Sequence, residues 1–225
     1  ASISQDQRIQ LLLIGFVFNA FLEGAAGFGV PIAICAVLLT QLGFKPLEAA
    51  MYCLVGNAAA GAYGAVGIPV AIIDTLNLSG DVSATEVALI GNLTLGFISF
   101  FVPFLLIFMI DGFRGIKEIL PSILVVSVTY TFLQVIITSF AGPELADIIP
   151  GLVAMVALAL FSSKFQPKNI FRLQQNEEPK RVAKHSFKKI VYAWSPFIIL
   201  TVIVLIWSSS FFKGLFEKKG LLHSL

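Results

Sequence analysis

The sequence is poor in charge. Only 12% of its 225 residues are Asp, Glu, Lys or Arg, and 57% are hydrophobic. A soluble domain is about a quarter charged. The mean hydropathy is +0.92, and the charges cluster, which leaves several stretches near the length of about 20 residues that crosses a bilayer. We therefore expect an all-α polytopic membrane protein and exclude a soluble globular domain.

Cysteine and histidine are also scarce, with two of each. Cys35 and Cys53 lie inside apolar stretches, where we expect them to pack as small side chains rather than to form a disulfide. His185 and His223 lie in polar segments, and no cluster has the spacing of a metal site. No nucleophile is paired with a base. The sequence thus argues against an enzyme and predicts no metal and no cofactor.

The apolar runs predict a single transmembrane domain over 1–225. Its expected parts are a helix–break–helix unit over 9–42, a broken helix over 46–73, and spans over 85–110, 119–140, 145–161 and 190–212. Each arm of the first unit is too short to cross about 30 Å. The unit is therefore either one discontinuous span or a re-entrant hairpin.

The segment 162–189 is the one long polar stretch, with eight lysines and arginines against two glutamates. The positive-inside rule places it in the cytoplasm, where it would contact anionic lipid heads. Trp194 and Trp207 lie near the ends of the last span, as interface anchors do. We expect a multi-pass protein of a plasma membrane that binds no nucleic acid.

The stretch from Glu23 to Pro31 holds three glycines, a proline and one carboxylate. Glycine and proline break helices. Glu23 is the only acidic residue that we expect deep in a membrane segment, because Asp111, Glu144 and Asp147 fall near span ends, where we expect them to be solvated. An intramembrane carboxylate is costly and functional by default. Glu23 is therefore interpreted as a proton carrier; the alternative is a protonated glutamate that bonds to carbonyls at the break.

A second break follows at a fixed distance. Asn19 and Asn57 lie 38 residues apart, as do Pro31 and Pro69. The repeat predicts two broken helices that meet at one site. The alternative is that the glycines only allow close packing.

Each proline is suited to the first position of a helix, where its missing N–H costs nothing. The residues before it would then offer free backbone N–H groups, which bind anions at helix N-termini. No Lys or Arg lies inside an apolar run, so this backbone is the expected site of a small carboxylate. The residues expected to bind it are Asn19, Gly27, Gly29, Val30, Asn57, Tyr63, Gly64, Gly67 and Ile68. Asn19, Asn57 and Tyr63 can equally satisfy the broken backbone.

Later spans carry further polar side chains. We expect these residues to make interhelical contacts rather than to bind substrate; they are Asn92, Thr94, Thr129, Tyr130, Thr131 and Gln134.

Three stretches, 23–33, 42–47 and 56–69, resemble the L-lactate permease family, and the resemblance is strong over about 9–73. It implies a bacterial inner-membrane symporter that moves L-lactate with H⁺, and often also D-lactate and glycolate. That family is grouped with ion transporters built from inverted repeats, re-entrant hairpins and broken helices. By this analogy a hairpin is favoured for 9–42 and a broken span for 46–73.

Members of that family are roughly twice as long, so the resemblance implies that this chain is one part of a polypeptide whose remainder is needed. The chain departs from the common Asn-Thr-Ala pattern by reading Asn57-Ala58-Ala59. The hydroxyl of that pattern is therefore absent.

These observations predict a secondary active transporter that takes up L-lactate and related 2-hydroxymonocarboxylates by proton symport, with Glu23 as the proton site. The alternatives are a transporter of another small anion coupled to Na⁺, and a channel or structural membrane subunit.

Overall fold

The computed structural model describes residues 3–76, 82–167, 169–173 and 187–208, together with residues 212 and 214. Every regular element within these ranges is a helix. Several of the helices are long and apolar enough to cross a membrane, which confirms the predicted all-α membrane protein. The chain forms two compact units, 1–183 and 184–225, which are described separately.

The first unit begins with one continuous apolar helix of 19 residues. It is built from α1 (Gln7–Leu11), the π-helix η1 (Leu12–Phe18) and α2 (Asn19–Ala25). This helix is longer than the arm that the sequence predicts, because it starts earlier and continues past Glu23. At about 1.5 Å per residue it approaches the thickness of a bilayer core.

The first break follows at residues 26–29. Gly27, Phe28 and Gly29 have φ values of 60°, 53° and 81°, a left-handed conformation that glycine adopts easily. The chain reverses there into α3 (Val30–Gln41), which packs against η1 and α2. The two helices therefore form a hairpin within this unit, and its re-entrant arrangement in a membrane stays a prediction.

The second broken helix consists of α4 (Pro46–Asn57) and a second arm bent by 69° from it. The second arm contains the 3₁₀ turn η2 (Gly61–Tyr63), α5 (Gly64–Ala71) and the 3₁₀ turn η3 (Ile72–Thr75). Inside α5 the left-handed region is occupied by Ala65, Val66 and Gly67. Only the last of these is a glycine, so the conformation is strained at the other two.

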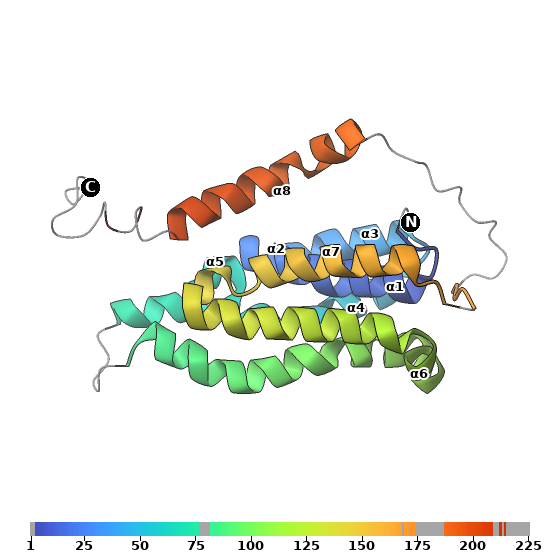
Figure 1. Cartoon of the computed structure of the whole chain (residues 1–225), viewed down its shortest axis with the longest axis horizontal. Coiled ribbons are helices and arrows are strands. Elements are labelled where there is room, and N and C mark those ends of the chain that lie inside the picture. Colours follow the sequence, from blue (N-terminus) through green and yellow to red (C-terminus); the bar gives the residue numbers. More distant parts are fainter. Residues whose placement is uncertain are drawn as a thin grey trace. The chain divides into compact units, whose positions relative to one another are not determined.

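The element α6 (Ala84–Ala141) is two helical arms joined by a turn. The turn lies between Gly112 (φ 61°, ψ −157°) and Ile119, where the backbone leaves the helical region. The arms run side by side in Figure 1. Contact is close near Gly96, where a methyl group would lie 3.6 Å from a Val135 methyl carbon.

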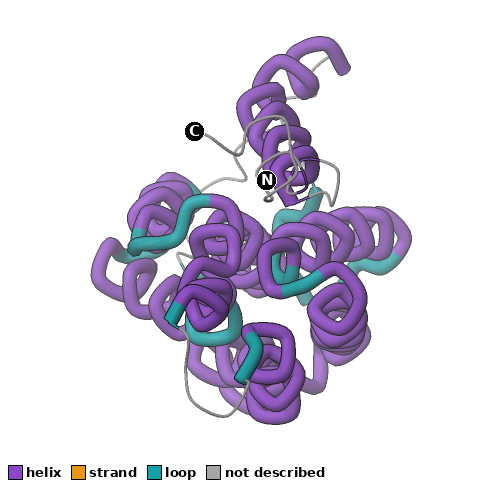
Figure 2. Tube along the Cα trace, turned by 90° about the vertical axis from the view of Figure 1, so that its left-hand side faces the viewer, coloured by secondary structure: helices purple, strands orange, loops and turns teal. Residues whose placement is uncertain are grey.

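After the 3₁₀ turn η4 (Pro143–Leu145) the chain enters α7 (Ile148–Lys164). This helix packs against α2 and α6, and Figure 2 shows the helices of the first unit nearly end-on. Gly151 permits the contact with α2, because a methyl group there would lie 2.9 Å from the Phe21 Cβ.

The second unit contributes α8 (Phe187–Ser208), which covers residues 190–208 of the predicted span 190–212; residues 209–211 lie outside the described part of the chain. Residues 168 and 174–186 of the basic segment lie outside the described residues, as do His185 and His223. The cytoplasmic location of that segment therefore stays a prediction.

Candidate functional site

The two helix breaks meet. A methyl group on Gly27 would lie 2.8 Å from both the Cβ and the backbone nitrogen of Ala65. A methyl group on Gly64 would overlap the Oε1 atom of Glu23. The left-handed backbone of each break is therefore in contact with the other, and Glu23 lies where they touch.

Glu23 lies in the last turn of α2, and its residue is only 5% exposed. The Asn57 side chain, at the end of α4, lies within interaction range of the Glu23 carboxyl group. The second carboxyl oxygen, Oε2, has no hydrogen-bond partner among the described residues. One end of each broken helix thus contributes a polar side chain to the same point.

Asn19 lies one helical turn before Glu23 and is fully buried. Its Nδ2 donates to the carbonyl oxygens of Cys53 (2.7 Å) and Gly15 (3.2 Å). The Oδ1 atoms of Asn19 and Asn57 have no partner within the described part of the chain. These two amide oxygens and the Glu23 carboxyl can accept a proton donor or a cation.

Asp147 is a buried member of this site that the sequence analysis missed. We expected it to be solvated at a span end, and this is wrong: Asp147 is 0% exposed at the start of α7. Its Oδ1 accepts hydrogen bonds from the Tyr130 hydroxyl (2.8 Å) and from Gln134 Nε2 (2.9 Å). Its Oδ2 has no partner in the described ranges. Glu23 is therefore not the only acidic residue buried in this protein.

The start of α7 is drawn inward by the turn before it. The backbone of η4 packs on α5, since a methyl group on Gly67 would lie 2.6 Å from the Pro143 carbonyl carbon. A methyl group on Gly24 would lie 2.8 Å from the Asp147 Cβ. The packing of this turn and the lack of a side chain on Gly24 together bring Asp147 beside the helix that carries Glu23.

A hydrogen-bond network connects Asp147 to the second break. Gln134 Oε1 accepts from the Ser99 hydroxyl (2.7 Å), and Gln134 Nε2 also lies 3.3 Å from the Ala59 carbonyl oxygen. Ala59 belongs to the turn that follows α4. The network thus joins both arms of α6, the second break and the start of α7.

The spacing of the polar residues in α6 carried a signal for this network. Tyr130, Gln134 and Thr138 are four residues apart and share one face of a helix, and all three are 0% exposed. In a span that is otherwise apolar, such a row indicates a polar partner on a neighbouring helix. The sequence does not identify this partner, because it is the turn at η4 that brings Asp147 against the polar face of α6.

Several predicted site residues do not join the cluster around Glu23. Gly29, Val30 and Ile68 are exposed on the surface of this chain. Gly67 lies against Pro143. The Tyr63 hydroxyl donates to Asn92 Oδ1 (2.9 Å) and lies 3.0 Å from the Ala88 carbonyl oxygen, so α6 holds it. The structure places Asn19, Gly27, Asn57 and Gly64 together with Glu23.

A second polar cluster surrounds Arg8, near the start of the first helix. Its side chain is 1% exposed and pairs with Asp6 (2.8 Å), Asp111 (2.7 Å) and Glu118 (2.8 Å). We expected no Arg inside an apolar helix; Arg8 lies inside this one, where it pairs with three carboxylates. Asp111 was expected to be solvated, but its side chain is only 14% exposed.

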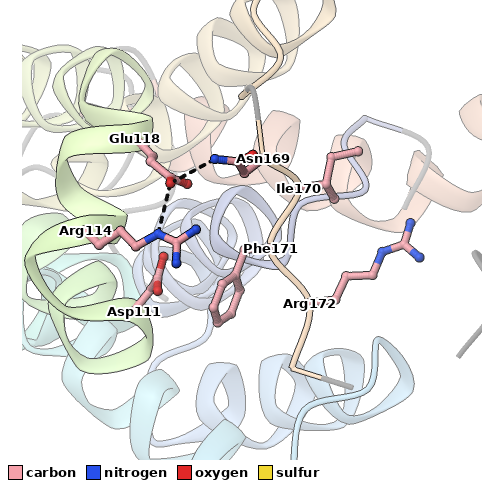
Figure 3. Close-up of a pocket in the computed structure, with 7 residues that line it drawn as sticks. All are labelled: Asp111, Arg114, Glu118, Asn169, Ile170, Phe171 and Arg172. Carbon is pink, nitrogen blue, oxygen red and sulfur yellow. Dashed lines mark hydrogen bonds and ion pairs between the residues drawn. The ribbon is translucent and has the colours of Figure 1, made fainter. Parts of the chain in front are cut away.

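The surface beside this cluster forms an open pocket of about 390 Å³, drawn in Figure 3. Arg114 and Asn169 both donate to Glu118 Oε1, at 3.1 Å and 3.3 Å. The hydrogen bonds from Arg8 and Arg114 lower the pKa of Glu118 to about 2. Of its lining residues, Asp111, Arg114 and Glu118 are already in ion pairs, and none of the residues around the helix breaks lines the pocket.

The chain was compared with known proteins. The sequence profile described as L-lactate permease matches residues 1–225. An L-lactate permease of Halalkalibacterium halodurans is 60% identical over 98% of this chain and 42% of its own length. The glycolate permease GlcA of Escherichia coli strain K12 is 43% identical over 100% of this chain and 42% of its own length. The L-lactate permease of Bacillus subtilis strain 168 is 42% identical over 92% of this chain and 38% of its own length.

No solved structure matches the chain. The chain spans about two fifths of the length of the curated relatives that it matches. The match of the profile covers the glycine-rich breaks and every helix described above. The chain therefore belongs to the L-lactate permease family, as its two glycine-rich stretches predict.

Proposed function

We propose that this chain forms part of a transporter that takes up L-lactate, and related 2-hydroxymonocarboxylates such as D-lactate and glycolate, by proton symport across a bacterial plasma membrane. Relatives named L-lactate permease and glycolate permease support the substrate class. The chain is only part of the length of those relatives, so transport belongs to the whole polypeptide.

The observation that carries the proposal is the position of Glu23 at the contact between two broken helices. The carboxyl group is buried and has one oxygen without a described partner. Secondary transporters bind substrate and coupling ion where interrupted helices meet inside the membrane. Glu23 would bind the proton, and Asn57 would keep the carboxyl group facing the second break.

The substrate would bind beside Glu23. The backbone N–H groups around Gly27 and Gly64 would receive the carboxylate, and Asn19 or Asn57 would hydrogen-bond to the hydroxyl group. The exposed residues Gly29, Val30 and Ile68 would bind substrate only with the remaining part of the polypeptide in place.

The test uses the full-length protein in proteoliposomes with an inward proton gradient and labelled L-lactate. Wild type should accumulate lactate against its gradient, and a protonophore should abolish the accumulation. Glu23→Gln should lose accumulation, because glutamine cannot exchange the proton. Glu48→Gln is the matched control, since Glu48 pairs with Lys45 at the exposed start of α4, at 3.1 Å. Uptake in Glu23→Gln with an unchanged dependence on pH would remove Glu23 from the mechanism.

A second candidate is coupling to Na⁺. The buried amide oxygens of Asn19 and Asn57 lack a described donor, and oxygen atoms at helix breaks coordinate Na⁺ in other transporters. Replacing Na⁺ with K⁺ in the uptake buffer separates the two candidates. Loss of uptake in K⁺ buffer at a constant proton gradient would favour Na⁺.

A further inference from the structure

We propose that Asp147 is a second proton-exchanging group of the transport site and works together with Glu23. The inference rests on the proposed function and deepens it, because it assigns the proton to two carboxyl groups instead of one.

Asp147 is buried with an incomplete set of hydrogen-bond partners. Asp147 is 0% exposed, and both of its donors, Tyr130 and Gln134, bond to the same oxygen, Oδ1. Oδ2 has no described partner. A carboxylate that served only to hold helices together would be expected to have both oxygens hydrogen-bonded, since an unpaired buried oxygen is costly. Oδ2 is therefore an oxygen at which a proton can be bound and released.

Asp147 also lies close to Glu23. The Asp147 side chain lies against Gly24, the next residue after Glu23, which brings the two buried carboxyl groups near each other. Two buried carboxyl groups that are neighbours repel each other when both are ionised. Their titrations are then coupled, so a proton that binds to one changes the affinity of the other.

The two carboxyl groups belong to different helices. Glu23 ends α2 beside the first break, while Asp147 starts α7 and is joined through Gln134 to Ala59 in the second break. A movement of the second break would act on Ala59 and through Gln134 on Asp147. Proton exchange at Asp147 would in this way be linked to the geometry of the second break by a route separate from the contact between Glu23 and Gly64.

The experiment uses the full-length protein in proteoliposomes and compares two kinds of transport. One is accumulation of labelled L-lactate driven by a proton gradient. The other is exchange of labelled for unlabelled lactate without a gradient, which needs substrate binding but no net proton movement. The variants are Asp147→Asn, which keeps the shape of the side chain, and Tyr130→Phe, which removes one donor to Oδ1. Glu48→Gln is the control.

Asp147→Asn should retain exchange while the ratio of internal to external lactate falls to about one, because uphill movement needs the coupled proton. Tyr130→Phe should keep accumulation but shift the pH midpoint of uptake, since it removes a hydrogen bond to one protonation state. Accumulation by Asp147→Asn at the wild-type level would overturn the proposal. Loss of both exchange and accumulation, together with a lowered melting temperature, would show a structural role and would also overturn it.

A spectroscopic measurement separates this proposal from the proposed function. Infrared difference spectra between acidic and alkaline pH report protonated carboxyl groups directly. One carboxyl band should titrate in wild type, disappear in Asp147→Asn and persist in Glu48→Gln. If wild type moved no lactate but this band were present, proton exchange at Asp147 would stand while the substrate assignment failed. If no such band were lost in Asp147→Asn, the proposal would be wrong whatever the protein transports.

Discussion

Gly24 and Asp147 lie in direct contact, and the contact depends on the absence of a side chain at Gly24. A methyl group there would lie 2.8 Å from the Asp147 Cβ and 3.0 Å from the Ile148 backbone nitrogen. The glycine lies inside the last turn of α2, where it costs helix stability relative to alanine. Its conformational freedom is not needed at this position, so its value to the protein is the close approach of α7.

Gly24→Ala should therefore destabilise the protein although alanine is the better helix former. Overpacking of a close contact costs about 1–3 kcal/mol, which exceeds the gain in helix propensity. The measurement is thermal unfolding of the purified full-length protein in detergent. Gly61→Ala is the control, because a methyl group there meets nothing within 4 Å. A Gly24→Ala protein as stable as Gly61→Ala would show that α7 shifts freely.

Arg8→Ala should be strongly destabilising. It would leave Asp6, whose side chain is 0% exposed, without its ion-pair partner, and removal of one member of a buried ion pair costs about 3–5 kcal/mol. Arg114→Ala is the matched control. The Arg114 side chain is 72% exposed, so its loss should cost about 1 kcal/mol or less. Equal melting temperatures for the two variants would contradict the role of Arg8 as a stabilising partner of buried carboxylates.

Acid should weaken the protein through Glu118. Its pKa is lowered to about 2 by Arg8 and Arg114, whereas an unfolded glutamate titrates near pH 4.3. On acidification the unfolded chain binds a proton first, so stability that is present above about pH 4.3 is lost as the pH falls toward 2. On acidification over this pH range, the melting temperature of Glu118→Gln should fall less than that of wild type. A Glu48→Gln control should follow the wild-type curve, and an identical curve for Glu118→Gln would refute the assignment.

Tyr63→Phe separates a structural hydroxyl from a substrate-binding one. The Tyr63 hydroxyl bonds to α6 at Asn92, and loss of one such hydrogen bond costs about 1 kcal/mol. The melting temperature of the full-length protein should fall slightly, while the KM for lactate uptake stays unchanged. A raised KM with unchanged stability would instead return Tyr63 to the substrate site predicted from the sequence.

Local chemistry explains why the two helix breaks could be predicted from the sequence. The helix breaks consist of glycines and prolines beside a single carboxylate. Glycine and proline set the backbone conformation at their own positions, without any tertiary contact. Gly27 and Gly64 could therefore be picked out without tertiary information. The extent of the first helix was underestimated, because the cap that Asp6 provides to Arg8 (2.9 Å) starts the helix two residues earlier.

The rest of the site depends on contacts between residues far apart in the sequence. Asp147 follows a short polar turn, which is the pattern of a solvated span end. It is buried because η4 packs against α5, and because Gly24 and Gly151 let α7 approach α2. Neither contact is indicated by the residues next to Asp147 in the sequence. The burial of Arg8 has the same cause, since its partners Asp111 and Glu118 lie more than a hundred positions away.

The π-helix η1 precedes Asn19 and Glu23 directly. Each of its turns holds about one residue more than an α-turn, and one residue corresponds to about 100° around a helix axis. A continuous α-helix through Leu12–Phe18 would rotate both side chains by about that angle, away from the second break. The π-helix therefore sets the rotation of Glu23 about the helix axis relative to the residues before Leu12. The position of Glu23 at the second break therefore depends on this π-helix as well as on the glycines.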